Sequence, residues 1–456
     1  MRVERPQAAT FGEFPLSLEY YEGPAGSGKT FQLIEALKAF VAEHPLRPDE
    51  AVLGVTYMHG SRRRMHSRLA KISVIKGRFV ACTIDSLARS LVCRWRSLAR
   101  IIDPDLNLST SPDFETICRV AAHLIRKQCV SAWLKARYPL VVIDELQDCR
   151  GDRLSIVQIL SSCCHVIAAA DEFQDLSSSS QNPAVEWLQR SGGKRTILTG
   201  NHRTHDRVLL QAANSLRSSL DCGDILGFGA ISARNAGVAA ASIARSLHWK
   251  WKKPNSAVIL TPTGPRKSDW VKNVLCRLSS KPIKPKGVPT EIGPFLLKWE
   301  ANTEDAKAEA DAKLGDMSRG ISLRDLEIKC SGDSGIFRDL CTWAARKFHV
   351  RGQTEFLESD VGTALDRILQ SRRSFLPTGS FGVVRAMTIH QAKNREFDGV
   401  IVLWPFTVGG NIESQRRLLY NALTRAQKWA IVVVQDNPDP NKSRLARPPF
   451  SKVPKS

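Results

Sequence analysis

Short apolar runs recur along this chain, and longer stretches with amphipathic spacing separate them. Such runs are typical of buried parallel strands, and the stretches between them are typical of helices packed on a sheet. The pattern therefore predicts an α/β fold with parallel sheets and small, mostly helical insertions. The predicted strands are 16–21, 51–57, 79–83, 140–143, 166–170, 257–261, 382–390, 397–403 and 429–434.

The chain has 456 residues, which is too long for one ordinary core and indicates several domains. We expect a first domain over 1–200, with a helical insertion at about 95–137. A second domain is expected over 201–440, with an inserted subdomain at about 280–378. Residues 441–456 are rich in proline, lysine and arginine, which predicts a disordered basic tail. Within the second insertion, helical patterns lie at 303–317, 335–347 and 359–371.

The formal net charge is +21, and the isoelectric point is near 9.7. This charge favours a polyanionic partner, most simply a nucleic acid. The alternative is a protein that is merely basic, or one bound to ribosomes. No run of eighteen apolar residues occurs, so no membrane span is expected. The eleven cysteines form no C-x-x-C pair, which indicates reduced thiols and a cytoplasmic location.

A glycine-rich loop stands between the first predicted strand and an amphipathic stretch at 31–41. Its spacing, G-x-x-x-x-G-K-T, lets backbone N–H groups point inward at phosphate oxygens, and the following helix adds the positive end of its dipole. The lysine would reach the β- and γ-phosphates, and the threonine hydroxyl would ligate Mg²⁺. A flexible loop before a helix is the plainer alternative. The loop predicts binding of a nucleoside triphosphate such as ATP through Gly23, Pro24, Ala25, Gly26, Ser27, Gly28, Lys29 and Thr30.

Two apolar strands end in similar acidic sequences. Asp144 and Glu145 follow the first of them, and Asp171 follows the second, with Gln174 three residues later. Ligands sit at the carboxyl ends of strands in parallel sheets, so Asp144 could hold Mg²⁺ and Glu145 could accept a proton from the attacking water. Gln174 would then sense the γ-phosphate. Spacing alone leaves open which of the two sequences is the metal site. A polar loop is expected at 176–194.

A strand that ends at Tyr57 leads into a helix with several arginines, among them Arg62. The tyrosine ring could stack on a base, while the guanidinium groups could contact phosphates. Taken alone, this segment could equally be a solvated basic face.

Several pieces of the sequence, taken in order, resemble the UvrD/Rep/PcrA-like superfamily 1 helicases. The resemblance implies two RecA-like P-loop domains with ATP and Mg²⁺ in the cleft between them. It also implies a DNA-stimulated ATPase that moves 3′ to 5′ along single strands. The pieces are GPAGSGKT, VTY, TIDSLARSL, VVIDELQD, ADEFQ, LTGNHRT, MTIHQAKNREFDGVIV and LYNALTRAQ.

The resemblance also implies roles for individual residues. Lys29 and Thr30 would hold phosphate and Mg²⁺, with Asp144 on the metal and Glu145 as general base. Arg203 and Arg425 would be the two arginines that the second domain brings to the γ-phosphate, where a late-arriving cation stabilises the transition state. The remaining roles fall on Gln174 as γ-phosphate sensor, His202 beside the adenine, Glu396 at the ribose, and Tyr57, Thr83, Thr388 and His390 near the DNA strand.

The chain departs from the family at several of these positions. Asn394 replaces a usual glycine, Asp85 a usual histidine, and His202 an aromatic that stacks on adenine. The residues after Gln174, Asp175–Ser180, lack the aromatic side chains that stack on DNA bases in the family.

Two hypotheses follow from the resemblance. One is a compact helicase or single-strand translocase. The other is an ATPase subunit that senses DNA and regulates a partner nuclease, similar to the helicase-like subunit of the anti-phage system Gabija. The short insertions and the serine run favour the second hypothesis. A P-loop protein that acts on something other than nucleic acid is a third possibility.

Overall fold

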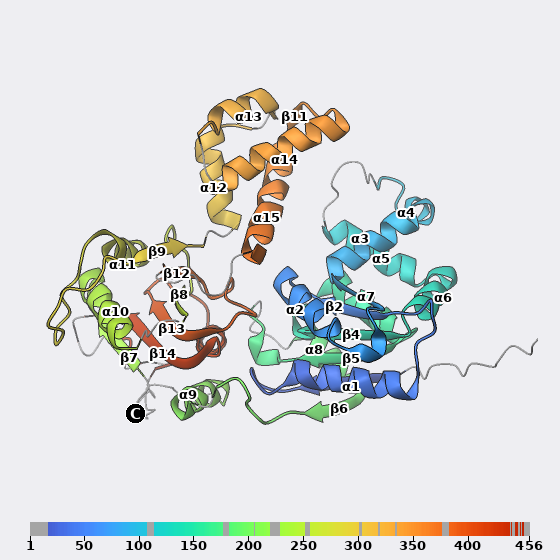
Figure 1. Ribbon diagram of the computed structural model, residues 1–456, viewed down its shortest axis with the longest axis horizontal. Helices are drawn as coiled ribbons and strands as arrows, with labels where there is room; N and C mark the ends of the chain where they lie inside the picture. Colours follow the sequence, from blue (N-terminus) through green and yellow to red (C-terminus); the bar gives the residue numbers. More distant parts are fainter. Residues whose placement is uncertain are drawn as a thin grey trace, which may run out of the picture. The chain divides into compact units, whose positions relative to one another are not determined.

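The computed structural model describes residues 17–106, 114–176, 182–204, 206–218, 229–250, 256–300, 303–317, 320–332, 335–375, 383–437, 439, 443–445, 447 and 449–450. These residues form two compact units (Figure 1). The first unit contains 17–172 and 182–200. The second contains 173–176 and the described residues from 201 onward.

The first unit is built on a six-stranded sheet in the order β3-β2-β4-β5-β1-β6, and all of its pairings are parallel. This order makes β4, β5 and β1 neighbours, so the three segments that follow their carboxyl ends share one edge of the sheet. The strands are β1 (Leu18–Glu22), β2 (Val52–Thr56), β3 (Phe79–Thr83), β4 (Leu140–Asp144), β5 (His165–Ala170) and β6 (Lys194–Ile197).

Helices cover both faces of this first sheet. On one face, Leu33 and Leu37 of α1 pack with Val142 and Ile167. On the other, Ile117 and Val120 of α5 pack in the cluster that contains the alternate strand residues. The alternation along β4 and β5 thus buries both faces of each strand. The helices are α1 (Lys29–Glu43), α2 (His59–Leu69), α3 (Ile84–Arg94), α4 (Arg96–Ile102), α5 (Phe114–Ile125), α6 (Gln128–Arg137), α7 (Gly151–Ser161) and α8 (Pro183–Arg190).

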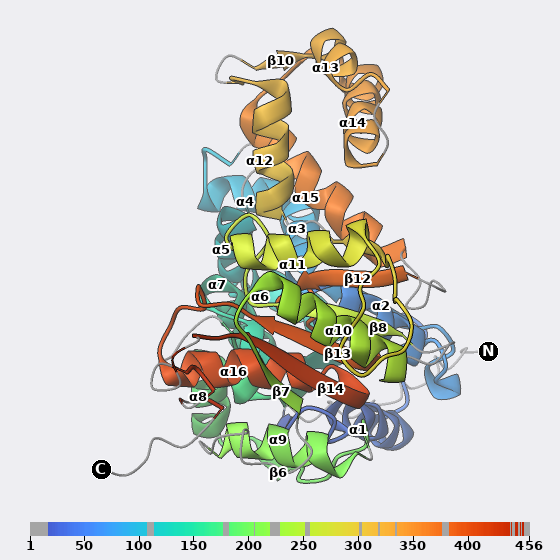
Figure 2. The ribbon, with the colours of Figure 1, turned by 90° about the vertical axis from the view of Figure 1, so that its left-hand side faces the viewer.

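The second unit contains another six-stranded parallel sheet, in the order β7-β14-β13-β8-β12-β9. Helices α10 and α11 lie side by side over one of its faces (Figure 2). Its strands are β7 (Gly229–Ala233), β8 (Ala257–Thr261), β9 (Leu296–Trp299), β12 (Val383–Thr388), β13 (Phe397–Trp404) and β14 (Ala426–Gln435), and its helices include α9 (Arg207–Arg217), α10 (Ala236–Lys250), α11 (Asp269–Ser280) and α16 (Ile412–Leu423).

A helical insertion follows β9 and has a small core of its own, which includes Leu326, Leu340 and Phe356. Its two short strands pair antiparallel. The elements are α12 (Thr303–Leu314), β10 (Ile321–Ser322), α13 (Leu323–Lys329), α14 (Ile336–Arg351), β11 (Glu355–Phe356) and α15 (Glu358–Phe375).

The predicted fold class, an α/β protein with two parallel sheets and helical insertions, is confirmed. Some local predictions were wrong. The insertion was expected from about 280, but β9 belongs to the sheet and the helices begin at Thr303. The polar loop expected at 176–194 contains α8, which Asn182 caps through bonds from two backbone N–H groups and which has proline at its first position.

The expected disordered tail was also wrong for its described residues. Phe450 is buried and meets the Trp404 ring edge-on, with 5.8 Å between the ring centroids. Ser443 and the backbone N–H of Arg444 donate to the Asp436 carboxylate at 2.8 and 2.6 Å. A single aromatic side chain and one buried carboxylate therefore hold this basic segment against the second sheet.

Within the described residues, none of the helices is both long enough and apolar enough to cross a membrane.

Candidate functional site

The glycine-rich loop joins β1 to α1 in the first unit. Gly26 and Gly28 have φ angles of 82° and 86°, a left-handed conformation that glycine adopts without strain. Gly23 has no room for a side chain, because a Cβ there would lie 2.6 Å from both the Leu198 carbonyl oxygen and Ser27 Oγ. The loop is therefore a tight turn. The N-terminus of α1, which follows it, lies at the edge of the sheet where the strands end.

Lys29 is nearly buried and lies across this loop. Its Nζ donates to the carbonyl oxygens of Gly23 at 2.8 Å and Pro24 at 2.9 Å. The same Nζ is 3.6 Å from Asp171 Oδ2, at the end of β5. The ammonium group thus sits inside the loop, at the position from which a lysine can reach bound phosphates.

Thr30 and Asp144 form a second contact at this edge. Thr30 Oγ1 donates to Asp144 Oδ2 at 3.0 Å. Burial raises the pKa of Asp144, and the neighbouring Glu145 charge raises it further, while the bond from Thr30 opposes both. A divalent cation held by these two oxygen donors would relieve the repulsion between the carboxylates.

Glu145 directly follows β4 in an unusual backbone conformation. Its φ of 61° and ψ of 45° are left-handed, which is uncommon for a residue with a side chain and costs about 1–3 kcal/mol. Its backbone N–H donates to Asp144 Oδ1 at 3.1 Å. This strained turn directs the chain away from the strand immediately after the two carboxylates.

Gln147 was not among the predicted site residues, although it stands two positions after Glu145. It is completely buried. Its Nε2 donates to Glu145 Oε2 at 2.5 Å, and its Oε1 accepts from the Asp171 backbone N–H at 3.0 Å. The two similar strand ends seen in the sequence are therefore joined through this one amide.

The predicted sensor Gln174 groups with the second unit, together with Phe173. Arg425 is 1% exposed, and its Nη2 donates to Gln174 Oε1 at 3.2 Å. Its Nε donates to the Asn421 carbonyl oxygen at 3.0 Å. Phe173 meets the Tyr420 ring edge-on, and the guanidinium groups of Arg217 and Arg417 lie over its faces at 5.8 and 5.7 Å.

Two other predicted residues of the second unit, Arg203 and Glu396, are paired with each other. Arg203 Nε lies 2.9 Å from Glu396 Oε1, and Arg203 Nη1 donates to the Thr424 carbonyl oxygen at 3.0 Å. Gln427 Nε2 holds the other oxygen of Glu396 at 2.9 Å. His202, expected beside the adenine, is exposed one residue before Arg203.

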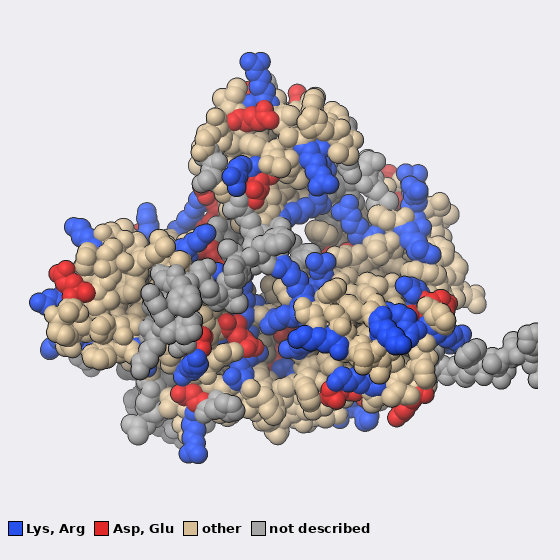
Figure 3. Space-filling model, viewed as in Figure 1, with Lys and Arg blue, Asp and Glu red and all other residues tan. Residues whose placement is uncertain are grey.

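The residues expected near a DNA strand differ in their accessibility. Tyr57 is 38% exposed at the end of β2, and Arg62 is exposed on α2. Lysines and arginines are numerous around α2 on the face seen in Figure 3. The hydroxyl of Thr83 is buried and caps α3 through Ser86, and that of Thr388 is buried beside Gln391. His390 is exposed.

Asn394, which stands where the sequence analysis expected a glycine, has a glycine-like backbone conformation. Its φ of 65° is left-handed, a conformation that asparagine tolerates better than most residues. A glycine would adopt the same backbone conformation without strain. The serine run at 177–180 lies outside the described residues.

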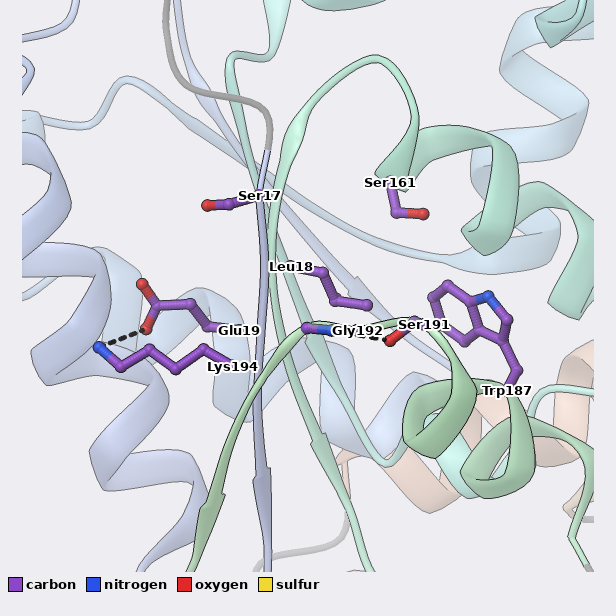
Figure 4. Close-up of a pocket in the computed structure, with 9 residues that line it drawn as sticks. Ser17, Leu18, Glu19, Ser161, Trp187, Ser191, Gly192 and Lys194 are labelled. Carbon is purple, nitrogen blue, oxygen red and sulfur yellow. Dashed lines mark hydrogen bonds and ion pairs between the residues drawn. The ribbon is translucent and has the colours of Figure 1, made fainter.

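A hollow of about 540 Å³ opens in the first unit at the opposite edge of the sheet, where β1 and β6 begin (Figure 4). Trp187, Ser161 and Lys194 are among the residues that line it, and Ser17 on its wall bonds to His165. No predicted site residue belongs to its described lining. The candidate site is therefore at the carboxyl edge, away from this hollow.

Taken together, the parallel sheets, the glycine-rich loop and the carboxylates at adjacent strand ends define a P-loop α/β protein with two sheet units. Residues 383–433 match the family model of the UvrD-like helicase C-terminal domain. This stretch contains two of the eight pieces that carried the sequence resemblance. The resemblance to UvrD-like superfamily 1 helicases is confirmed through this domain, and it supports helicase or translocase activity in general terms.

No curated protein matches the chain. A solved structure of Pif1 helicases, described as two coordinating helicases that unwind forked double-stranded DNA, shares 14% identity with a TM-score of 0.35. The match covers 92% of this chain and 88% of that one. The similarity to helicases found by these comparisons therefore rests on the family match over residues 383–433.

Proposed function

We propose that this protein is a DNA-stimulated ATPase that works as a helicase or single-strand translocase with 3′ to 5′ polarity. The observation that carries the proposal is the carboxyl edge of the first sheet. There Thr30 bonds to Asp144, and Gln147 bonds both to Glu145 and to the backbone N–H of Asp171. Lys29 lies 3.6 Å from the Asp171 carboxylate.

The loop has the chemistry to hold a triphosphate. Ser27 Oγ is buried and has no hydrogen-bond partner among the described residues, as expected for a group that would bond to a phosphate oxygen. The first turn of α1 contains no acidic residue that would repel an anion.

Thr30 and Asp144 fit Mg²⁺, which prefers oxygen ligands and usually keeps one or two carboxylates together with substrate phosphates. Among the described residues, no group of three or more His, Cys, Asp or Glu could hold a metal alone. We therefore expect the ion to arrive with the nucleotide. When bound, it would neutralise charge on the phosphates.

In this proposal, the residues of the chain have distinct tasks. Glu145 accepts a proton from the attacking water, and Lys29 leaves the loop carbonyls to contact the phosphates. Arg425 and Arg203 supply positive charge to the γ-phosphate, with Gln174 beside Arg425 as its sensor. Glu396 contacts the ribose.

DNA is the proposed partner because the net charge is +21 and because Tyr57 and Arg62 are accessible at neighbouring points on the first unit. The 3′ to 5′ polarity is part of the proposal on the strength of the sequence resemblance. The scattered cysteines favour a cytoplasmic location, and the ten that the structure describes are all unbridged.

A second candidate function is a DNA-sensing ATPase subunit that regulates a nuclease, with little unwinding. It is favoured by the absence of aromatic residues in Asp175–Ser180, because base stacking is worth about 1–3 kcal/mol per base. An anti-phage role would suit such a subunit.

The test measures ATP hydrolysis with and without single-stranded DNA, and strand displacement on duplexes with a 3′ or a 5′ tail. We expect single strands to stimulate hydrolysis and only the 3′-tailed duplex to be separated. Stimulated hydrolysis without displacement would favour the sensor function. A rate of ATP hydrolysis that is the same with and without DNA would overturn both proposed functions.

A further inference from the structure

We infer that Gln147 is a positioning residue that fixes the general base and ties it to the end of β5, so that the state of that strand end regulates hydrolysis. The inference rests on the proposed ATPase function. The inference assigns Gln147 no contact with phosphate or DNA.

The side chain makes one bond in each direction. Its Nε2 donates to Glu145 Oε2 at 2.5 Å, so the amide N–H group fixes the orientation of the carboxylate. Its Oε1 accepts from the Asp171 backbone N–H at 3.0 Å. A neutral amide of this length offers a donor and an acceptor to these two partners at once.

Burial of Gln147 strengthens both of these hydrogen bonds. Gln147 is 0% exposed, so solvent water does not compete for its amide, and an unmade bond would be costly. Its backbone carbonyl also accepts from Asn182 Nδ2 at 2.8 Å, and Asn182 caps α8. The segment that carries Gln147 is thus anchored independently of its side chain.

The far end of the link has chemical consequences. The Asp171 carboxylate lies 3.6 Å from Lys29 Nζ, so the amide joins the base to the partner of the phosphate-binding lysine. Two residues after Asp171, the chain enters the segment that groups with the second unit. A shift of that segment would therefore be transmitted along the backbone to Gln147 and then to Glu145.

The main test is Gln147→Met in the full chain, which keeps the length of the side chain and removes both polar atoms. We expect single-turnover ATP hydrolysis to fall about 100-fold, because small misplacements of a catalytic group have effects of this size. ATP affinity, measured with a fluorescent analogue, should stay unchanged because the hydrogen bonds of the Gln147 side chain in the described structure go to Glu145 and Asp171 and not to the loop.

Asn182→Ser is the matched control. A serine keeps the helix cap but loses the bond to the Gln147 backbone, so it loosens the segment without touching the amide. We expect this variant to hydrolyse ATP at close to the wild-type rate. An equal loss in both variants would mean that Gln147 matters only for local folding, which would overturn the inference.

A double-mutant cycle with Glu145→Gln separates positioning from general damage. If Gln147 acts through Glu145, Gln147→Met should add little further loss to the Glu145→Gln variant. Independent, additive losses would contradict the inference. If thermal unfolding measurements show that the Gln147→Met variant is not folded, Gln147→Glu is used in its place, because glutamate retains an acceptor for the Asp171 N–H.

The outcome distinguishes the inference from the function on which it rests. A wild-type protein that neither binds nor hydrolyses ATP would defeat the proposed function. A wild-type protein that hydrolyses ATP, with a Gln147→Met variant as fast, would defeat only the inference.

Discussion

Arg425 Nη2 donates to Gln174 Oε1 at 3.2 Å, and both side chains are almost fully buried. Gln174 stands only four residues after the last residue of β5, yet its contacts group it with the second unit. The predicted γ-phosphate sensor and one of the predicted arginines are therefore hydrogen-bonded to each other within the second unit.

We predict that Arg425→Ala lowers kcat for ATP about 1000-fold, within the range measured for catalytic arginines. The loss of its bonds to Gln174 and to the Asn421 carbonyl should also cost about 1–3 kcal/mol of stability. Stopped-flow hydrolysis and urea unfolding would measure the two effects. Lys38→Ala, which removes an ion pair with Glu35 in which both side chains are exposed, is the control and should change neither.

Glu396→Gln tests the ribose contact. The carboxylate holds Arg203 and Gln427, so its neutral replacement keeps the shape and weakens the charged bond. If Glu396 also binds the ribose, the wild type should prefer ATP to 3′-deoxy-ATP by about tenfold, the value of one hydrogen bond to a charged group. The variant should lose that preference. A preference that survives the substitution would exclude Glu396 as the ribose contact.

Gly23→Ala tests the tightness of the loop. The added methyl group would lie 2.6 Å from the Leu198 carbonyl oxygen, so the loop must shift. We expect weaker nucleotide binding and a lower melting temperature. Gly60→Ala on α2 is the matched control, because a Cβ there meets nothing within 4 Å, and alanine should stabilise the helix by up to about 1 kcal/mol. Equal nucleotide affinity in both variants would argue against the loop as the binding site.

Asp436 gives a pH-dependent prediction. Burial by itself would raise the pKa of Asp436, but bonds from the Arg444 N–H, Ser443 and Asn437 outweigh it and hold the pKa below its ordinary value. A carboxyl group whose pKa is lower in the folded state stabilises the fold above the unfolded pKa of about 3.9 and loses that contribution as pH falls through the folded value.

Asp436→Asn should therefore unfold at lower urea than the wild type at pH 7, and the gap should narrow as the pH falls below about 4. Asp311→Asn, on the exposed side of α12, is the control and should show little difference at any pH. A gap for Asp436→Asn that stays constant down to pH 3 would show that its effect is not electrostatic.

The sequence allowed the fold and the loop to be predicted because their signals are local. The run at 140–143 is short and rich in β-branched residues, which favours a strand, and the spacing from Gly23 to Thr30 is typical of a phosphate-binding turn. Adjacent carboxylates at a strand end could likewise be recognised as a potential site. Their roles remain predictions.

The parts that could not be predicted depend on long-range pairing. The link from Gln147 to Asp171 exists because β4 and β5 pair in parallel, for example Val141 with Val166, which no local pattern reveals. Edge strand β9 was not predicted because the lysines and prolines before it indicated a linker. Phe450 looked like part of a basic tail because one buried ring carries little weight in composition.

Edge strand β7 has β14 as its sheet neighbour, with Gly229 opposite Ile431, so its partner is made about two hundred residues later. During synthesis, the backbone donors and acceptors of β7 stay unpaired until most of the second unit has left the ribosome. Loop closure over such a separation is slow, and waiting strand edges associate readily with other chains. We therefore expect nascent chains of this protein to need chaperones, and slow or cold expression to raise its yield.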